Sequence, residues 1–146
     1  MVRAAAHAAR SEPGVLTRLV RAARADPSDL EVADGLILAC PENLGAPSGE
    51  MKEFLDRAYY PLLERIEGRA CAIMVCAGTD GGGAVRQLAR VCAGWRLKMV
   101  AEPLIVRTNA QTPEAILAGK KLDPEALSRC AELGAAMAAG LEMGIW

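Results

Sequence analysis

The sequence has few aromatic residues and no excess of basic charge. Only five of its 146 residues are Phe, Tyr or Trp, and 17 Lys and Arg side chains are balanced by 18 Asp and Glu, which gives a net charge of −1. Proteins that bind nucleic acids use a positive surface for the phosphates and aromatic rings for base stacking. We therefore expect no nucleic-acid partner.

Long hydrophobic runs are also missing. No apolar stretch approaches the roughly 20 residues that a membrane-spanning helix needs. The first residues place Arg3, His7 and Arg10 among alanines, and this pattern lacks the apolar core of a signal peptide. We therefore expect no membrane partner and a cytoplasmic location.

Patterns typical of metal sites and of catalytic side chains are absent as well. The five cysteines form no Cys-x-x-Cys pair, and His7 is the single histidine. The neighbours of these cysteines are aliphatic, which favours reduced, buried thiols over zinc ligands or disulfides. There is no Gly-x-Ser-x-Gly turn for a serine hydrolase. The sequence predicts no metal and no catalytic side chain.

What the sequence contains is an alternation of short apolar runs with amphipathic stretches. A chain of 146 residues without repeats or a long linker predicts a single domain over residues 1–146. Strands are predicted at Val15–Arg21, Gly35–Cys40, Ala70–Ala77 and Met99–Val106. The middle two are apolar at successive positions, as in strands of a parallel sheet covered on both faces. The alternation therefore predicts an α/β domain with a doubly wound parallel sheet.

The amphipathic stretches between these runs predict helices. They cover residues 2–10, 49–66 and 84–95 and begin again after Thr112-Pro113 and Asp123-Pro124. In the second of them, Pro61 is expected to bend or split the helix, because proline lacks a backbone donor and clashes with the preceding turn. The third is expected to be capped by Asp80 and the adjacent glycines.

Two predicted loops are rich in glycine and follow neighbouring strands. Residues 41–49 read Pro-Glu-Asn-Leu-Gly-Ala-Pro-Ser-Gly, and residues 77–83 read Ala-Gly-Thr-Asp-Gly-Gly-Gly. Ligands of doubly wound sheets bind beyond the carboxyl ends of the strands, and glycine lets a flat ligand approach the main chain. The loops therefore predict a ligand site at one edge of the sheet, although short turns with capping residues would have a similar composition.

Residues 33–57 resemble the third-strand segment of the flavodoxin-like NAD(P)H-dependent FMN reductases and quinone reductases. In that family a strand ending in Pro-x-x-x-Gly is followed by Ser-Gly and a Lys-x-Phe-Leu-Asp helix, and the resemblance continues through Gly-Thr-Asp-Gly-Gly to the Gly-Leu-Glu-Met-Gly ending. It implies a flavodoxin-like sheet with strand order 2-1-3-4-5 and FMN lying across both loops. The residues implied to contact the flavin are Pro41, Glu42, Asn43, Leu44 and Gly45 from the first loop and Ala77, Gly78, Thr79, Gly81 and Gly82 from the second.

The sequence departs from the family pattern at its beginning. Members of the family open with an apolar strand and a Ser/Thr-rich phosphate loop, whereas residues 2–10 here already read as the first helix. We expect the first strand to be missing, so that the strands at 15–21 and 35–40 each have an unpaired inner edge unless an upstream segment or another chain fills the gap. We also expect weak FMN binding or none, because the remaining glycine-rich run lies beside Asp80.

The resemblance implies an NAD(P)H-dependent oxidoreductase. Hydride would pass from the nicotinamide to FMN and on to a small-molecule, quinone-like acceptor, in a homo-oligomer. Backbone N–H groups of both loops, with Asn43 and Thr79, are expected to stabilise the reduced ring, and Glu42 is expected to point outward. The absence of aromatic residues from both loops favours a substrate-accepting pocket over a shielded electron carrier. The alternative is a flavin-free flavodoxin-like binding or assembly module, which the fold by itself does not exclude.

Overall fold

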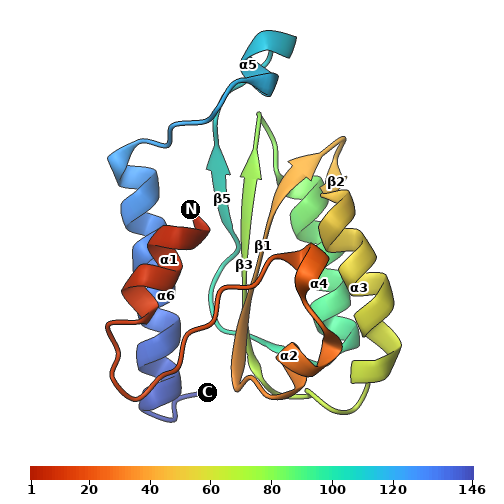
Figure 1. The fold of residues 1–146 in the computed structure, drawn as a ribbon, viewed down its shortest axis with the longest axis vertical. Helices are drawn as coiled ribbons and strands as arrows, with labels where there is room; N and C mark the ends of the chain where they lie inside the picture. Colours follow the sequence, from red (N-terminus) through yellow and green to blue (C-terminus); the bar gives the residue numbers. More distant parts are fainter.

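The computed structural model describes residues 1–146 as three layers (Figure 1). A mainly parallel sheet forms the middle layer. Helices α1 (Val2–Ala9) and α6 (Pro124–Glu142) pack together on one face, and α3 (Gly49–Leu62) and α4 (Gly82–Gly94) cover the other. The predicted α/β architecture, covered by helices on both faces, is confirmed. No helix combines the length and apolar character needed to cross a membrane.

Three parallel strands form the centre of the sheet. Strand β3 (Ala70–Ala77) lies between β1 (Gly35–Asn43) on one side and β5 (Leu104–Arg107) on the other. The short β4 (Lys98–Met99) pairs with the beginning of β3, and β2 (Ala46–Pro47) forms an antiparallel hairpin with the end of β1. The strands predicted at 35–40 and 70–77 are therefore present, and the second has the predicted bounds.

Side chains of β3 are buried on both faces of the sheet. Ile73 and Val75 belong to the larger apolar core, which lies under α3 and α4. Met74 belongs to the smaller core, together with Ala5 of α1 and Cys130 of α6. Burial of one aliphatic side chain of this size stabilises a fold by about 1.5–3 kcal/mol. The central strand thus joins the two helical layers through both of its faces.

Local sequence signals place most helix ends. Helix α3 runs through Pro61 without being split and ends at Leu62, before the predicted end at residue 66, where Leu63 leaves the helical conformation with a ψ of 133°. Helices α5 (Pro113–Leu117) and α6 begin as predicted. Their N-cap side chains, Thr112 and Asp123, accept hydrogen bonds from the third helical N–H groups at 3.2 and 2.6 Å.

The predicted strand at residues 15–21 is wrong. This segment is extended but belongs to no ladder, and no backbone hydrogen bond joins it to β1. It crosses from the α1 layer to the α3 layer (Figure 1), and the side chain of Leu16 is 89% exposed. A β-strand exists only through pairing with a neighbour, and the strand that would lie between this segment and β1 is not part of the sheet.

The predicted strand at residues 99–106 is interrupted. Ladder pairing with β3 covers residues 98–99 and resumes at Leu104. Pro103 precedes the second part and has no N–H group to donate to a ladder. The two pieces, β4 and β5, still pair with the same strand, so the expected position of this run in the sheet is correct.

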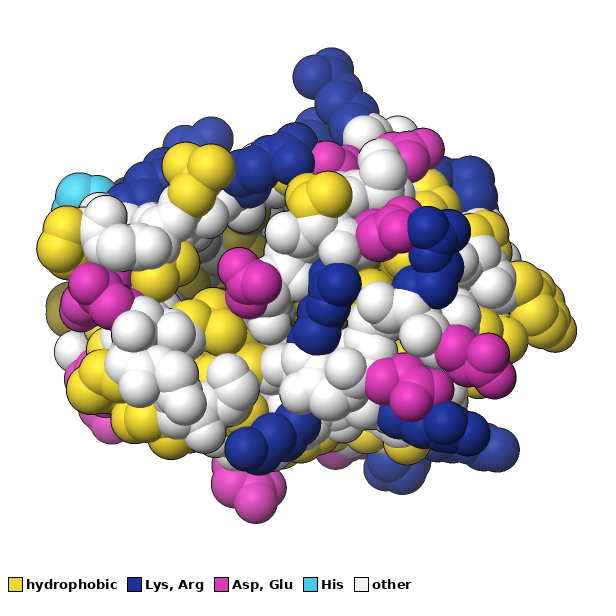
Figure 2. Space-filling view, turned by 90° about the horizontal axis from the view of Figure 1, so that it is seen from below, with side chains coloured by type: hydrophobic (Ala, Val, Ile, Leu, Met, Phe, Trp, Pro, Cys, Tyr) yellow, Lys and Arg dark blue, Asp and Glu magenta, His cyan; other side chains and the backbone are white.

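The edge of β1 that faces away from β3, which is the inner edge in the expected strand order, is largely unpaired. Residues 35–41 pair with β3 on one side, while on the other side only Glu42 and Asn43 pair, with β2. This confirms the expected open inner edge of the strand at 35–40. The structure thus contains the last three strands of the expected order 2-1-3-4-5. Viewed from below, the molecule is hollowed, with apolar side chains at the bottom of the hollow (Figure 2).

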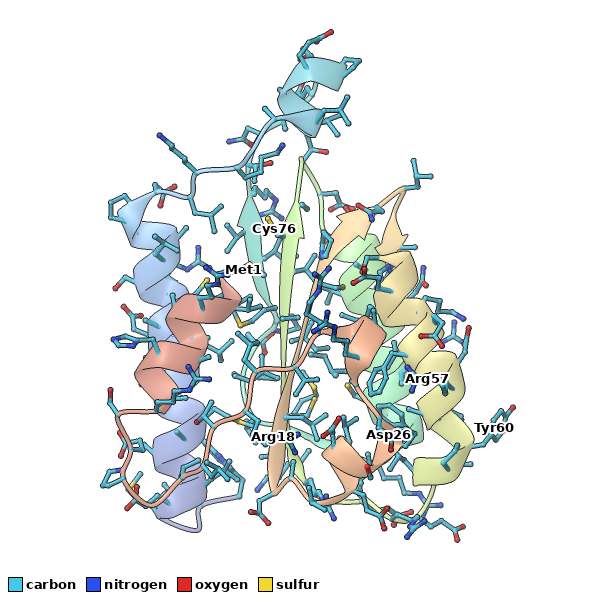
Figure 3. The ribbon with its side chains drawn as sticks, in the orientation of Figure 1. Met1, Arg18, Asp26, Arg57, Tyr60 and Cys76 are labelled. Atoms are coloured by element: carbon cyan, nitrogen blue, oxygen red, sulfur yellow. The ribbon has the colours of Figure 1, made fainter.

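The segment after the crossing is fixed to α3 by polar contacts. It contains the short helices η1 (Ala22–Arg24) and α2 (Pro27–Glu31). Arg57 points from α3 toward this segment (Figure 3) and donates to the carbonyl oxygen of Ala25 at 2.9 Å. Asp26 caps α2 by accepting from the Ser28 N–H at 3.0 Å. The hydrogen bond from Arg57 thus holds the segment with η1 and α2 against helix α3.

Candidate functional site

The carboxyl ends of β1, β3 and β5 meet at one edge of the sheet, which we call the carboxyl edge (Figure 1). The chain leaves β1 through a hairpin, β3 through residues 78–81 and β5 through residues 108–112. A Glu42 carboxylate oxygen lies 2.7 Å from the Gly81 nitrogen. The two glycine-rich segments that the sequence singled out are therefore in contact at a common edge, as expected.

The first of these segments is a hairpin rather than a loop. Pro41 and Asn43 belong to the end of β1, and Asn43 pairs with Ala46 of β2. The turn consists of Leu44 and Gly45, with φ values of 52° and 73°, as in the tight turns that match strand twist. Leucine is uncommon at a positive φ, so this turn lacks the Asn-Gly signal that would have predicted it.

Glycines of the second segment allow the protein's own chain to approach closely. A Cβ atom at Gly81 would lie 2.5 Å from the Ile105 side chain, and Gly81 has a φ of 88°. A Cβ atom at Gly78 would lie 2.9 Å from the carbonyl oxygen of Ala110, in the segment after β5. Both glycines are therefore required by packing within the fold, independently of any ligand.

Glu42 does not point outward, and that expectation is wrong. Its two carboxylate oxygens accept hydrogen bonds from the N–H groups of Gly81 and Ala84, at 2.7 and 3.1 Å. These N–H groups lie at the beginning of α4, where the helix dipole is positive and backbone donors lack partners. The predicted cap, Asp80, makes no capping hydrogen bond there. A carboxylate from a neighbouring strand has taken that role.

The segment after β5 also belongs to the carboxyl edge, although the sequence analysis did not include it. Arg107 donates to the carbonyl oxygen of Thr79 at 2.9 Å. The hydroxyl group of Thr108 donates to the carbonyl oxygen of Ala77 at 3.2 Å. Asn109 adopts a positive φ of 54°. The rule that ligands bind beyond all carboxyl ends of a parallel sheet would have pointed to this segment.

The ten expected flavin contacts differ in their accessibility. The structure exposes Pro41, Asn43, Leu44, Gly45 and Thr79, leaves Glu42, Gly78 and Gly82 half-buried, and buries Ala77 and Gly81. The buried pair can offer a ligand little surface, because Ala77 is a core residue and Gly81 packs on Ile105. Contact between any of the ten and a flavin stays a prediction.

The thiol near the carboxyl edge belongs to Cys76, at the second-last position of β3. Burial raises the pKa of the Cys76 thiol above its ordinary value, so this thiol is protonated, and therefore a weak nucleophile, at neutral pH. No group of three or more His, Cys, Asp or Glu residues lies close enough together to hold a metal ion. The carboxyl edge instead offers backbone groups and small polar side chains to a ligand.

Known proteins resemble this chain in sequence. Residues 12–111 match the sequence profile of the family described as NADPH-dependent FMN reductase. A flavodoxin from Aquifex aeolicus (strain VF5) is 37% identical over 86 residues, which cover 58% of this chain and 46% of that protein. The aligned part of the chain thus spans about half the length of this curated relative.

Solved structures share the fold at low sequence identity. A flavodoxin from the domain Archaea has a TM-score of 0.74 at 13% identity, covering 96% of this chain and 87% of that one. A flavodoxin, WrbA-like protein from Agrobacterium tumefaciens has a TM-score of 0.70 at 15% identity, with coverage of 97% and 87%. An NADPH-quinone reductase from P. pentosaceus has a TM-score of 0.60 at 19% identity, with coverage of 94% and 88%.

These similarities agree with the architecture described above. The solved structures establish a flavodoxin-like fold, and the sequence profile matches about two thirds of the chain. The chain belongs to the NADPH-dependent FMN reductase family.

Proposed function

We propose that the carboxyl edge binds the isoalloxazine ring of FMN, and that the protein is an NAD(P)H-dependent oxidoreductase that reduces a quinone-like small molecule. The observation that carries this proposal is the contact between Glu42 and Gly81, which joins the two glycine-rich segments into one surface. A planar ring lying across this surface would meet main chain from both segments. Family membership supports the same chemistry.

The exposed part of the carboxyl edge fits a planar ring. Pro41 and Leu44 offer apolar contact, while the side chains of Asn43 and Thr79 are free to hydrogen-bond with polar atoms of the ring edge. When bound, FMN supplies the chemistry of accepting a hydride and passing it on. The protein would orient the ring, and backbone N–H groups of the two segments, other than those of Gly81 and Ala84 that Glu42 accepts from, would favour negative charge on it.

The carboxyl edge offers the ring of FMN a binding surface, but it offers no comparable site for the phosphate of FMN. The beginning of α4 has positive helix-dipole character, but the carboxylate of Glu42 accepts from its N–H groups. Asp80 lies beside it and would repel a second anion. We therefore propose that this chain recognises the ring system more than the phosphate, and that it binds FMN weakly.

Titration of the purified chain with FMN and with riboflavin tests both parts of this proposal. We expect saturable changes in flavin absorbance and fluorescence, with dissociation constants for the two flavins that agree within about threefold, since the phosphate adds little. Addition of NADPH, or NADH, and a quinone should then produce flavin-dependent oxidation of the nicotinamide. Absence of binding by either flavin would favour the flavin-free binding module. If FMN bound tightly and stoichiometrically while riboflavin did not bind, this would contradict the proposal that the phosphate adds little to the affinity.

We further propose that the protein is a cytoplasmic homo-oligomer. Leu44 at the carboxyl edge is fully exposed, and Ile116 and Leu117 on α5, beyond the same edge (Figure 1), are 57% and 87% exposed. Apolar side chains exposed beside a ligand site support contact with another subunit. Light scattering coupled to gel filtration tests the oligomer, and a mass equal to the monomer at 100 µM, a concentration on the order of weak dimer affinities, would contradict it.

A further inference from the structure

The beginning of α4 has no cap of its own. Its N-cap residue is Gly81, which has no side chain, and its first turn contains no acidic residue. The first N–H groups of any helix lack partners within the helix and lie at the positive end of its dipole. In this sequence the helix therefore depends on a group from elsewhere in the fold.

Glu42 supplies that group from a strand 39 residues earlier. One carboxylate oxygen accepts from the N–H of Gly81, the N-cap residue, at 2.7 Å, and the other from the N–H of Ala84, the third residue of the helix, at 3.1 Å. The second is the donor that an Asp or Ser side chain at the N-cap normally satisfies. The geometry is thus that of a helix cap supplied by another element.

Backbone packing holds the hairpin at the same place. A Cβ atom built on Gly83 would lie 2.1 Å from the Gly45 carbonyl oxygen and 3.1 Å from a Glu42 carboxylate oxygen. The hairpin turn therefore contacts the first turn of α4 directly. Charge-assisted hydrogen bonds to backbone N–H groups are stronger than neutral ones, so the carboxylate adds orientation to this contact.

We propose that Glu42 is a positioning residue that acts as a built-in anion at the beginning of α4. Its carboxylate fixes the β1–β2 hairpin and residues 78–81 in one arrangement, and it excludes free phosphate from this helix end. The consequence for ligand affinity rests on the proposed flavin site. The hydrogen bonds and the exclusion of phosphate concern the protein without flavin and are tested separately.

The first test uses the flavin-free protein and needs no variant. Amide resonances of Gly81 and Ala84 are followed by NMR during titration with inorganic phosphate at constant ionic strength. We expect no saturable shift, because the carboxylate already accepts from both N–H groups. A saturable phosphate-dependent shift of these two amides would overturn the proposal.

The second test compares Glu42→Ala and Glu42→Gln with Asp80→Asn. Asp80 lies beside the same helix end but makes no hydrogen bond to it, so its variant controls for loss of one negative charge. In Glu42→Ala we expect amide exchange at Gly81 and Ala84 to accelerate by about tenfold or more, as for loss of a charge-assisted hydrogen bond. Glu42→Gln retains one acceptor oxygen and should show a smaller effect. Asp80→Asn should leave both amides unchanged.

Rescue by small anions separates this role from general loss of structure. In Glu42→Ala the N–H groups of α4 become available, and millimolar acetate or inorganic phosphate should restore protection at Gly81 and Ala84. The same anions should not affect Asp80→Asn. The proposal would be overturned if amide exchange in Glu42→Ala were the same as in the wild type. It would also be overturned if Glu42→Ala lost protection that neither anion restored, although its far-UV circular dichroism remained native. If Glu42→Ala does not fold, the same exchange and rescue measurements on Glu42→Gln decide.

The flavin measurement comes last. If the carboxyl edge binds the ring, Glu42→Ala should weaken riboflavin binding by about tenfold, since misplacement of the two segments removes half of the binding surface, and Asp80→Asn should change it less than about twofold. Absence of flavin binding by the wild type would refute the proposed function and leave the anion result intact. Flavin binding that is equal in wild type and Glu42→Ala would refute the effect of Glu42 on affinity.

Discussion

The carbonyl oxygen of Gly45 lies so close to Gly83 that a Cβ atom on Gly83 would be 2.1 Å away from it. The first residue belongs to the turn of the β1–β2 hairpin, and the second lies in the first turn of α4. This contact brings the end of one strand to the helix that follows the next strand. It fixes the geometry of the carboxyl edge.

Replacement of Gly83 by alanine should therefore destabilise the protein. The new methyl group would force the hairpin away from α4, and overpacking of this kind costs about 1–3 kcal/mol. Gly49→Ala is the matched control, because Gly49 is also in the first turn of a helix and a Cβ atom there meets nothing within 4 Å. Urea unfolding should show Gly49→Ala to be neutral or slightly stabilising. Equal midpoints for the two variants would refute the close contact.

Stability should fall as the pH rises above 9. The thiols of Cys71 and Cys92 lie 3.4 Å apart in the core. Hydrogen bonding with Cys92, followed by burial, raises the pKa of Cys71 far above its ordinary value of 9.0, while the same hydrogen bond lowers the pKa of Cys92, so that the folded pair keeps one proton. The folded protein therefore keeps this proton where the unfolded chain has lost it, so that the contribution is complete below pH 9 and decreases above it by up to about 1.4 kcal/mol per pH unit.

Denaturant titrations between pH 7 and pH 10.5 measure this dependence. A double variant, Cys71→Ala with Cys92→Ala, lacks both thiols of the pair, so the slope of its unfolding free energy against pH should be shallower than that of the wild type above pH 9. Parallel slopes for the two proteins would show that Cys71 does not retain its proton in the folded state.

Amide hydrogen exchange should differ between β1 and β3. Strand β3 pairs on both sides, whereas residues 35–41 of β1 pair on one side only. Alternate N–H groups of a parallel strand point to opposite neighbours, so about half of those at residues 36–40 should exchange much faster than the amides of β3. Uniform protection along β1 would mean that another part of the protein, or another molecule, pairs with the edge of β1 that faces away from β3.

Arg69→Lys should loosen the segment that precedes β1. One nitrogen of the Arg69 guanidinium, Nη1, lies 2.8, 2.6 and 2.6 Å from the carbonyl oxygens of Leu30, Glu31 and Ala33. The ammonium nitrogen of lysine sits on a shorter side chain and does not extend as far as Nη1, so we expect these contacts to weaken and a loss of about 1–3 kcal/mol in urea unfolding. Arg90→Lys, on the exposed side of α4, should have no measurable effect. Equal stability of the two variants would show that the three hydrogen bonds contribute little.

Local patterns were sufficient for the elements that depend on few partners. The strand at Ala70–Ala77 was predicted with its observed bounds, because it is apolar at every position and its ends are marked by the change in composition. The starts of α5 and α6 were predicted from Thr112-Pro113 and Asp123-Pro124, because an N-cap side chain acts within three residues of itself. The motif that follows Cys40 was sufficient to suggest the family, which the match over residues 12–111 confirmed.

Elements that depend on distant partners could not be predicted in the same way. Residues 15–21 have the composition of a strand, yet they form none, because ladder hydrogen bonds require a neighbour that the sequence of the segment does not reveal. Glu42 was expected to face solvent, because a carboxylate beside a flavin ring that becomes anionic would oppose reduction of the ring, whereas its hydrogen bonds to the distant beginning of α4 had no local signal.

The sequence by itself determined which segments are apolar, where most helices begin and which segments carry glycine, because these properties act over a few residues. Only the tertiary structure decided that the beginning of α4 would lie close enough to Glu42 for its backbone N–H groups to donate to the Glu42 carboxylate. The two groups are far apart along the chain, and their attraction becomes effective only after packing of the sheet and helices has brought them together.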